Sequence, residues 1–316
     1  MTEPVERAGG NRRPVMVTGA SGMLGGNLTL DFVRRAPVVA MGWPRIASLP
    51  GVDMACVDLR DESAVAAVMR RTSPGTVIHC AALTDVDLCE RDPVNAFAVN
   101  AQATRVLGRE AAAVGAGIVF ISTDSVFAGD RAPYDEGAAP GPVNVYAASK
   151  LEGEQAALAT NPDALVLRVN IFGWSPSGSH GLAEWIVGRL RRGAEVTGYG
   201  DVLFAPITVW EVGRVIVAAL GSGLRGIYHV ACDEGSSKLD FAKAVAREFD
   251  LSEELVTESS VDRVTMAARR PKDTRLSPLR LSRALGREPP SMLDGVRELR
   301  RLELEGRRDS LRMLVG

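Results

Sequence analysis

The segment Val15-Met16-Val17-Thr18-Gly19-Ala20-Ser21-Gly22-Met23-Leu24-Gly25 decides the fold that we expect for this chain. Its first four residues form an apolar run, and a helical stretch continues from the last glycines. Gly19 permits a tight turn, Gly22 lets backbone N–H groups approach a phosphate, and Gly25 lets a helix pack closely on a strand. The position of the turn after the first strand predicts a dinucleotide site. The residues expected to form it are Gly19, Ser21, Gly22, Met23, Leu24 and Gly25.

Apolar runs of strand length alternate with helical stretches through the first half of the chain. We expect strands at 15–18, 38–41, 54–57, 76–80, 118–122 and 164–169, and helices at 24–35, 62–71 and about 94–114. This alternation implies right-handed crossovers and a parallel sheet covered on both faces. We therefore expect an α/β fold with a doubly wound parallel Rossmann sheet and a smaller, interleaved α/β substrate-binding lobe. The predicted boundaries are 13–172 with about 209–232 for the first domain, and about 173–208 and 233–316 for the lobe.

Composition excludes several classes of partner. The chain has 316 residues, and 37 Lys and Arg stand against 39 Asp and Glu, which gives a formal net charge of -2. Without an excess of positive charge, neither nucleic acid nor a membrane is expected as a partner. The three histidines and four cysteines lack the spacing of metal ligands, so no metal site is expected. No apolar run reaches the ~18 residues of a membrane span, and we expect reduced thiols and a cytoplasmic protein.

The end of the second strand bears on the choice of cofactor. An NAD-selective site usually has an acidic residue there, whereas this chain has Gly42-Trp43-Pro44-Arg45. Arg45 could face a 2′-phosphate, which favours NADPH, with NADH as the alternative if Arg45 is a solvated loop residue. Asp58, after the third strand, could bind the adenine amine or cap the next helix.

A tyrosine and a lysine stand four residues apart at the start of another helical run, Tyr146-Ala-Ala-Ser-Lys150. This spacing puts both side chains on one helix face. A tyrosine with its ordinary pKa near ~10 cycles poorly as an acid and base, and an adjacent ammonium can stabilise the phenolate. A third polar group that can hold a substrate oxygen is supplied by Ser122-Thr123, at the end of a parallel strand. The sequence therefore predicts a catalytic set of Tyr146, Lys150 and a hydroxyl of Ser122-Thr123.

These motifs together resemble the short-chain dehydrogenase/reductase superfamily in its extended branch. TGASGMLG, VIHCAA, VNAQAT, ISTDSVF, YAASK and LRVNIFG follow in family order, and the likeness is nearest to the dTDP-4-dehydrorhamnose reductase family. The resemblance implies that Thr123 orients a carbonyl, that Tyr146 protonates it, that Lys150 lowers the pKa of the tyrosine and binds ribose, and that Asn100 joins the hydrogen-bond framework. The cofactor-binding residues it implies beyond the glycine turn are Arg45, Asp58, Leu59, Ala81, Ala82, Tyr146 and Lys150.

The chain departs from that family at positions expected to meet the substrate. Ser125 replaces the tyrosine of the STDYVF pattern, and Ile171 replaces a tryptophan. Arg270, with Arg269, precedes a proline and could clamp a diphosphate or only anchor a loop. The substrate-binding residues that we expect are Ser125, Asn170, His180 and Arg270.

Three functions remain open from the sequence. The first is an NAD(P)H-dependent ketoreductase that acts on a keto group of a nucleotide-activated, TDP-linked deoxysugar. The second is the same chemistry on a keto-sugar already attached to a natural product, which the altered pocket would suit. The third is a non-catalytic NAD(P)-binding regulatory subunit similar to the β-subunit of methionine adenosyltransferase, which the intact catalytic set disfavours. A small-molecule keto-sugar is the expected partner, and a homodimer is an open expectation.

Overall fold

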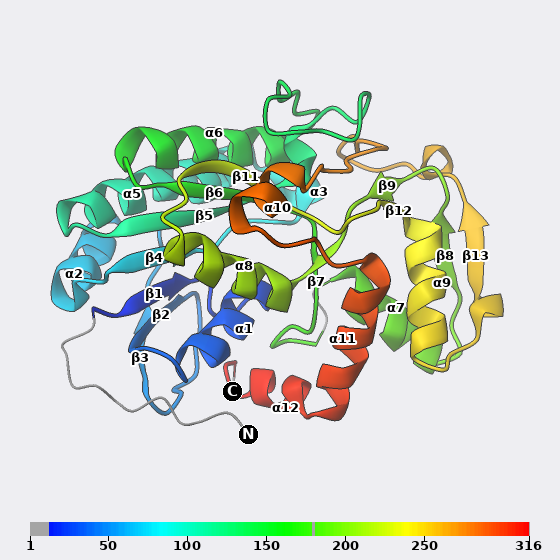
Figure 1. Cartoon of the computed structure of the whole chain (residues 1–316), viewed down its shortest axis with the longest axis horizontal. Helices are drawn as coiled ribbons and strands as arrows, with labels where there is room; N and C mark the ends of the chain where they lie inside the picture. Colours follow the sequence, from blue (N-terminus) through cyan, green and yellow to red (C-terminus); the bar gives the residue numbers. More distant parts are fainter. Residues whose placement is uncertain (1–12, 179–180, 316) are drawn as a thin grey trace.

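The computed structural model describes residues 13–178 and 181–315. Within them, seven parallel strands form the central sheet in the order β11-β6-β5-β4-β1-β2-β3 (Figure 1). The strands are β1 (Val15–Thr18), β2 (Val38–Gly42), β3 (Val52–Cys56), β4 (Thr76–His79), β5 (Gly117–Thr123), β6 (Leu165–Val169) and β11 (Gly226–Val230). The chain runs outward from β1 to β3 and then returns to β4 on the other side of β1. The expected doubly wound Rossmann sheet is confirmed, with its switch point between β1 and β4.

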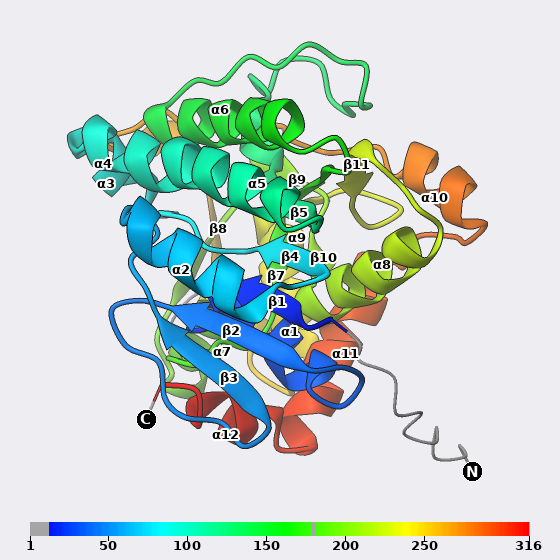
Figure 2. The same cartoon turned by 90° about the vertical axis from the view of Figure 1, so that its left-hand side faces the viewer.

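Helices cover both faces of this sheet (Figure 2). On one face lie α1 (Met23–Phe32) and α8 (Val209–Gly221), which contact each other, and on the other lie α2 (Glu62–Thr72), α5 (Ala103–Ala113) and α6 (Val145–Thr160). The buried apolar residues divide accordingly into two large clusters, one on each side of the sheet. Because both faces are buried, the strands read as continuous apolar runs rather than as alternating ones.

Most of the remaining elements lie beyond one side of the sheet, at the right of Figure 1, and the others lie against the sheet and its helices. Three two-stranded pairings occur there: parallel β7 with β10, antiparallel β9 with β12, and parallel β8 with β13. The elements are β7 (Ile171–Phe172), α7 (Leu182–Arg191), β8 (Val196–Tyr199), β9 (Leu203–Phe204), β10 (Ile207–Thr208), β12 (Ser236–Ser237), α9 (Lys238–Glu248), β13 (Val256–Ser259), α10 (Leu279–Leu285), α11 (Met292–Leu304) and α12 (Arg307–Arg312). Between them the chain returns to the sheet as β11. The exact domain boundaries stay a prediction.

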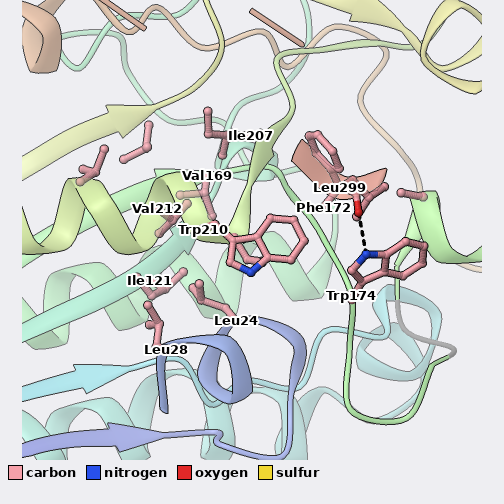
Figure 3. Packing of buried hydrophobic residues seen from close by; sticks show 14 of the residues in the cluster. Leu24, Leu28, Ile121, Val169, Phe172, Trp174, Ile207, Trp210, Val212 and Leu299 are labelled. Carbon is pink, nitrogen blue, oxygen red and sulfur yellow. Dashed lines mark hydrogen bonds between the residues drawn. The ribbon is translucent and has the colours of Figure 1, made fainter. Parts of the chain in front are cut away.

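One apolar core joins the sheet to the C-terminal helices (Figure 3). Trp174 is fully buried in it, and its Nε1 donates a 2.9 Å hydrogen bond to the carbonyl oxygen of Leu299 on α11. Leu24 and Leu28 of α1 and Val212 of α8 belong to the same cluster. The position of the C-terminal elements is therefore fixed against the helix that follows the glycine turn.

The helix expected at about 94–114 is confirmed in its extent, but it contains a π-helical turn, and a short helix that the sequence did not predict precedes it. The structure has α3 (Val86–Arg91), α4 (Pro93–Phe97), a π-helical turn η1 (Ala98–Gln102) and then α5. Pro93 has no N–H and starts a new helix, which the side chain of Asp92 caps. In the part of the chain described, no helix has the length and apolar character that a membrane crossing requires.

Candidate functional site

A cavity of about 870 Å³ opens at the carboxyl ends of the central strands. Such a volume lies within the range of small-molecule and cofactor sites, and this edge is where open parallel sheets bind ligands. It is lined by the glycine turn and by residues that follow β2, β3, β4, β5 and β6. The predicted site residues that line it are Gly19, Ser21, Gly22, Met23, Leu24, Gly25, Asp58, Leu59, Ala81, Ala82, Thr123, Ser125, Tyr146, Lys150 and Asn170.

The glycine turn has the geometry that the sequence predicts. Gly19 has φ of 68°, and a Cβ atom there would meet the backbone of Ala81 at 2.7 Å. A Cβ atom on Gly25 would lie 2.2 Å from the carbonyl oxygen of Gly19, so α1 can approach the turn only with glycine at this position. Among the described residues no side chain caps the N-terminus of α1 at Gly22, and its first turn has no acidic residue. Its backbone N–H groups therefore suit a phosphate anion.

Arg45, which the sequence predicts to contact the cofactor, is not among the described residues that line the cavity. Arg45 is exposed, and the arginine found among the described lining residues is Arg60. Arg60 binds Asp58 through both carboxylate oxygens, at 3.0 and 2.6 Å, which holds the pKa of Asp58 below its usual range. The helix cap proposed for Asp58 belongs instead to Asp61, which accepts the N–H of Ala64. A role of Arg45 toward a 2′-phosphate stays a prediction.

Lys150 lies on α6 one turn after Tyr146, as expected, and is 3% exposed. Its Nζ donates a 2.7 Å hydrogen bond to the carbonyl oxygen of Ile121 and lies 4.1 Å from the ring centroid of Phe120. Burial lowers the pKa of Lys150 to about 8, against the charge of Glu154, which raises it. The side chain is thus a buried cation at the floor of the cavity.

The expected lowering of the Tyr146 pKa is not what its surroundings produce. Burial raises the pKa of Tyr146 above its ordinary value, and the charge of Asp124 acts in the same direction, whereas hydrogen bonding with Thr123 opposes the rise. The physical reason is first the burial of the phenol, which disfavours its charged form, and then the negative charge of Asp124, while the ammonium of Lys150 is bound to Ile121 on the sheet. In this state the tyrosine is held as a proton donor.

The polar groups around Thr123 are organised by the carboxylate of Asp124, directly after β5. Thr123 Oγ1 donates to Asp124 Oδ1 at 3.1 Å and accepts the N–H of Ser125. Asn170 Nδ2 donates to Asp124 Oδ2 at 2.7 Å. Thr123, Ser125 and Asn170 therefore meet at one end of the cavity, and a contact of Ser125 or Asn170 with a substrate stays a prediction.

Asn100 lies outside the lining of the cavity and supports its walls. It belongs to the π-helical turn η1 and is buried. Its Nδ2 donates to the carbonyl oxygen of Leu83 at 3.0 Å and to Ser149 Oγ at 2.9 Å, and its Oδ1 accepts the N–H of Leu83. Asn100 thus joins the loop after β4 to α6, in agreement with a framework role.

Arg270 is not among the described residues that line the cavity. Arg270 pairs with Asp87 of α3 at 3.1 Å and donates to the carbonyl oxygen of Ala268, so in this structure it anchors its own loop. His180 lies outside the described residues. Contacts of either residue with a substrate stay predictions.

Sequence reasoning missed several residues of the cavity wall, among them Trp43, Arg60 and Asp124. Trp43, 53% exposed, follows β2, and Arg60 lies in the loop after β3. Asp124 follows Thr123 at the end of β5. The signal that could have found them is their position, because every residue just after a parallel strand faces this edge of the sheet.

The chain is similar to known proteins over most of its length. The family model described as the RmlD substrate binding domain matches residues 13–302. A dTDP-4-dehydrorhamnose reductase of Sinorhizobium fredii is 32% identical over 90% of this chain and 95% of its own. Methionine adenosyltransferase 2 subunit beta of Danio rerio is 33% identical over 85% of this chain and 84% of its own.

A solved structure agrees over the same length. The dTDP-4-dehydrorhamnose reductase of Bacillus anthracis, determined in complex with NADP, superposes with a TM-score of 0.80 at 28% identity, covering 91% of this chain and 98% of its own. Both the sequence match and the shared fold extend through the sheet and the C-terminal elements. The chain therefore belongs to the RmlD substrate-binding-domain family.

Proposed function

We propose that this protein is an NAD(P)H-dependent ketoreductase that reduces a keto group of a TDP-linked deoxysugar. The observation that carries the proposal is that Thr123, Tyr146 and Lys150 line the same cavity as the glycine turn. A proton donor and a dinucleotide site in one cavity are the two components that carbonyl reduction requires. The similarity to dTDP-4-dehydrorhamnose reductases supports this substrate class.

The residues present fit a dinucleotide. The uncapped first turn of α1 and the bare backbone at Gly19 and Gly22 would hold the pyrophosphate. A bound nicotinamide supplies the hydride for the carbonyl carbon. Thr123 would orient the carbonyl oxygen, and Tyr146 would give it the phenolic proton. Lys150, once the tyrosine has lost that proton, would stabilise the phenolate.

NADPH is the cofactor that we propose, and NADH is the alternative. The NADP found in the Bacillus anthracis reductase supports it. The guanidinium of Arg60 lies in the cavity wall beside Asp58, the residue predicted to bind the adenine amine, and adds a positive charge there. Comparing kcat/KM for NADPH and NADH tests this choice, and a preference for NADH would contradict it.

A regulatory, non-catalytic role is the second candidate. The similarity to methionine adenosyltransferase 2 subunit beta favours it. The discriminating experiment measures NADPH consumption with a panel of TDP-4-keto-6-deoxysugars and with keto-sugars attached to a natural product. Turnover of a TDP-linked sugar supports our proposal. Turnover of only the attached sugars would show instead that the substrate is a keto-sugar on a natural product. Tight cofactor binding without any turnover supports the subunit.

Two further properties belong to this proposal. We place the protein in the cytoplasm, because its four cysteines are free thiols. We keep the homodimer as a prediction, which the molar mass in solution tests.

A further inference from the structure

Four hydrogen bonds converge on the buried carboxylate of Asp124, which is 2% exposed. Its Oδ1 accepts Thr123 Oγ1 at 3.1 Å and Ser125 Oγ at 3.3 Å. Its Oδ2 accepts Asn170 Nδ2 at 2.7 Å and Thr274 Oγ1 at 2.5 Å. A carboxylate has about four acceptor sites, so these four donors occupy them and fix the orientation of the side chain.

Thr274 brings the C-terminal part of the chain to this carboxylate from 150 residues away. Thr274 is buried, and the backbone around it is held against β9. The N–H of Thr274 donates to the carbonyl oxygen of Leu203 at 3.0 Å, and the N–H of Leu203 donates to the carbonyl oxygen of Lys272 at 2.6 Å. The hydroxyl of Thr274 therefore reaches Asp124 from a backbone that two hydrogen bonds hold in place.

We propose that Asp124 and Thr274 are positioning residues of the reducing site: Thr274 holds the carboxylate of Asp124, and this carboxylate fixes Thr123 and keeps the proton on Tyr146 until substrate takes it. The inference rests on the ketoreductase function proposed above. A reductase needs its tyrosine protonated at the start of the reaction, and a fixed negative charge beside the phenol opposes loss of that proton.

The charges around Asp124 and Tyr146 agree with this assignment. Asp124 and Cys89 of α3 both act to raise the pKa of Tyr146. On α6 itself, Lys150 faces the sheet. From α3, the carboxylate of Glu90 accepts the N–H of Val145, the residue before Tyr146. From α9, Lys238 faces Asp124, whose charge raises the pKa of that lysine. Asp124 is therefore the carboxylate that acts on both Tyr146 and Lys238.

The test compares Asp124→Asn, Thr274→Val and the matched control Thr274→Ser. Asparagine keeps an acceptor for Thr123 but removes the charge, valine keeps the shape of Thr274 but removes its hydroxyl, and serine restores that hydroxyl. Melting temperature and the Kd for NADPH identify any variant that fails to fold. With the wild type active on a keto-sugar, we expect Thr274→Val to lower kcat about tenfold with KM changed less than twofold, and Thr274→Ser to stay within twofold.

The readout that does not need turnover is the titration of Tyr146, followed by NMR of protein carrying ¹³Cζ-tyrosine and saturated with NADP⁺. Tyr146→Phe assigns the resonance. We expect the apparent pKa of Tyr146 to fall by about one unit or more in Asp124→Asn, and to change little in Thr274→Ser. An unchanged titration in Asp124→Asn overturns the inference, as does equal kcat for Thr274→Val and Thr274→Ser. A wild type that reduces no keto-sugar overturns the proposed function instead, while the titration still decides the role of Asp124.

Discussion

The ammonium of Lys150 is bound at 2.7 Å to the carbonyl oxygen of Ile121, so the lysine expected beside the tyrosine is tied to the sheet. Its burial lowers its pKa to about 8. A lysine with that pKa changes charge close to physiological pH. The stabilisation that we propose for the phenolate of Tyr146 is therefore sensitive to pH in the working range.

The first prediction is a loss of reductase activity above pH 8. Lys150 is charged below its pKa and neutral above it, and only the charged form stabilises the phenolate. We expect kcat/KM for NADPH, which reports groups of the free enzyme, to fall about tenfold per pH unit above about pH 8. Because Glu154 raises the pKa of Lys150, Glu154→Gln should move this fall to lower pH. A profile that stays flat to pH 10 would exclude the role given to Lys150.

The second prediction concerns the ion pair beneath the site. Arg168 NH2 and Glu154 Oε2 are 2.7 Å apart and almost completely buried, and Ser122 Oγ donates to Glu154 Oε1 at 2.5 Å. Removing one partner leaves an uncompensated buried charge, so we expect Arg168→Met to cost about 3–5 kcal/mol in the free energy of unfolding. Denaturant unfolding measures it.

The control is the double variant Arg168→Met with Glu154→Gln. It removes both charges together, and we expect it to recover at least half of the stability that Arg168→Met loses. Equal losses in the single and double variants would show that packing of the arginine, and not the unpaired carboxylate, carries the effect.

The third prediction tests the glycine turn. In Gly25→Ala the new methyl group would meet the carbonyl oxygen of Gly19 at 2.2 Å, and α1 must move away from the turn. We expect a loss of about 1–3 kcal/mol of stability and at least tenfold weaker binding of NADPH, measured by calorimetry. The matched control is Gly221→Ala in α8, where a Cβ atom meets nothing within 4 Å, and it should bind NADPH as the wild type does. Equal binding by both variants would refute the role of Gly25.

The fourth prediction concerns Lys238, the first residue of α9. Its Nζ lies 3.3 Å from the ring centroid of Phe204, and burial lowers its pKa to about 8, while Asp124 raises it. A positive charge at a helix N-terminus is unfavourable. The unfolded chain binds more protons than the folded one between about pH 8 and 10.5, so the penalty is complete below pH 8 and disappears as pH rises through this window.

We therefore expect Lys238→Met to raise the free energy of unfolding by about 1 kcal/mol at pH 7, after the lost contact with Phe204 is subtracted. The gain should shrink at pH 9.5. Lys243→Met, on the same helix, is the control and should change stability less. Thermal unfolding at pH 7 and pH 9.5 tests this prediction. A Lys238→Met protein that is less stable than the wild type at pH 7 would contradict the penalty.

The sequence predicts those parts of the site that depend on the backbone. The turn at Gly19 and Gly25 was predictable because only glycine allows its positive φ and its close approach to α1. The four-residue spacing of Tyr146 and Lys150 follows from helix geometry.

What the sequence could not predict depends on contacts between distant segments. The hydrogen bond from Thr274 to Asp124 joins residues 150 positions apart. The rise in the pKa of Tyr146 depends first on its burial and then on the charge of Asp124, and both follow from how distant segments pack together. The start of the helix at Pro93 is a local signal, however, because proline favours the first turn of a helix.

The most direct measurement of the proposed function follows the hydride. NADPH carrying deuterium on the nicotinamide C4 is incubated with the protein and a TDP-4-keto-6-deoxysugar, and the sugar product is analysed by mass spectrometry. We predict one deuterium on the carbon that bore the ketone, with the wild type, and a rate lower by about 10²–10⁴ in Tyr146→Phe at an unchanged Kd for NADPH. A product without deuterium, or a Tyr146→Phe protein as fast as the wild type, would contradict the account.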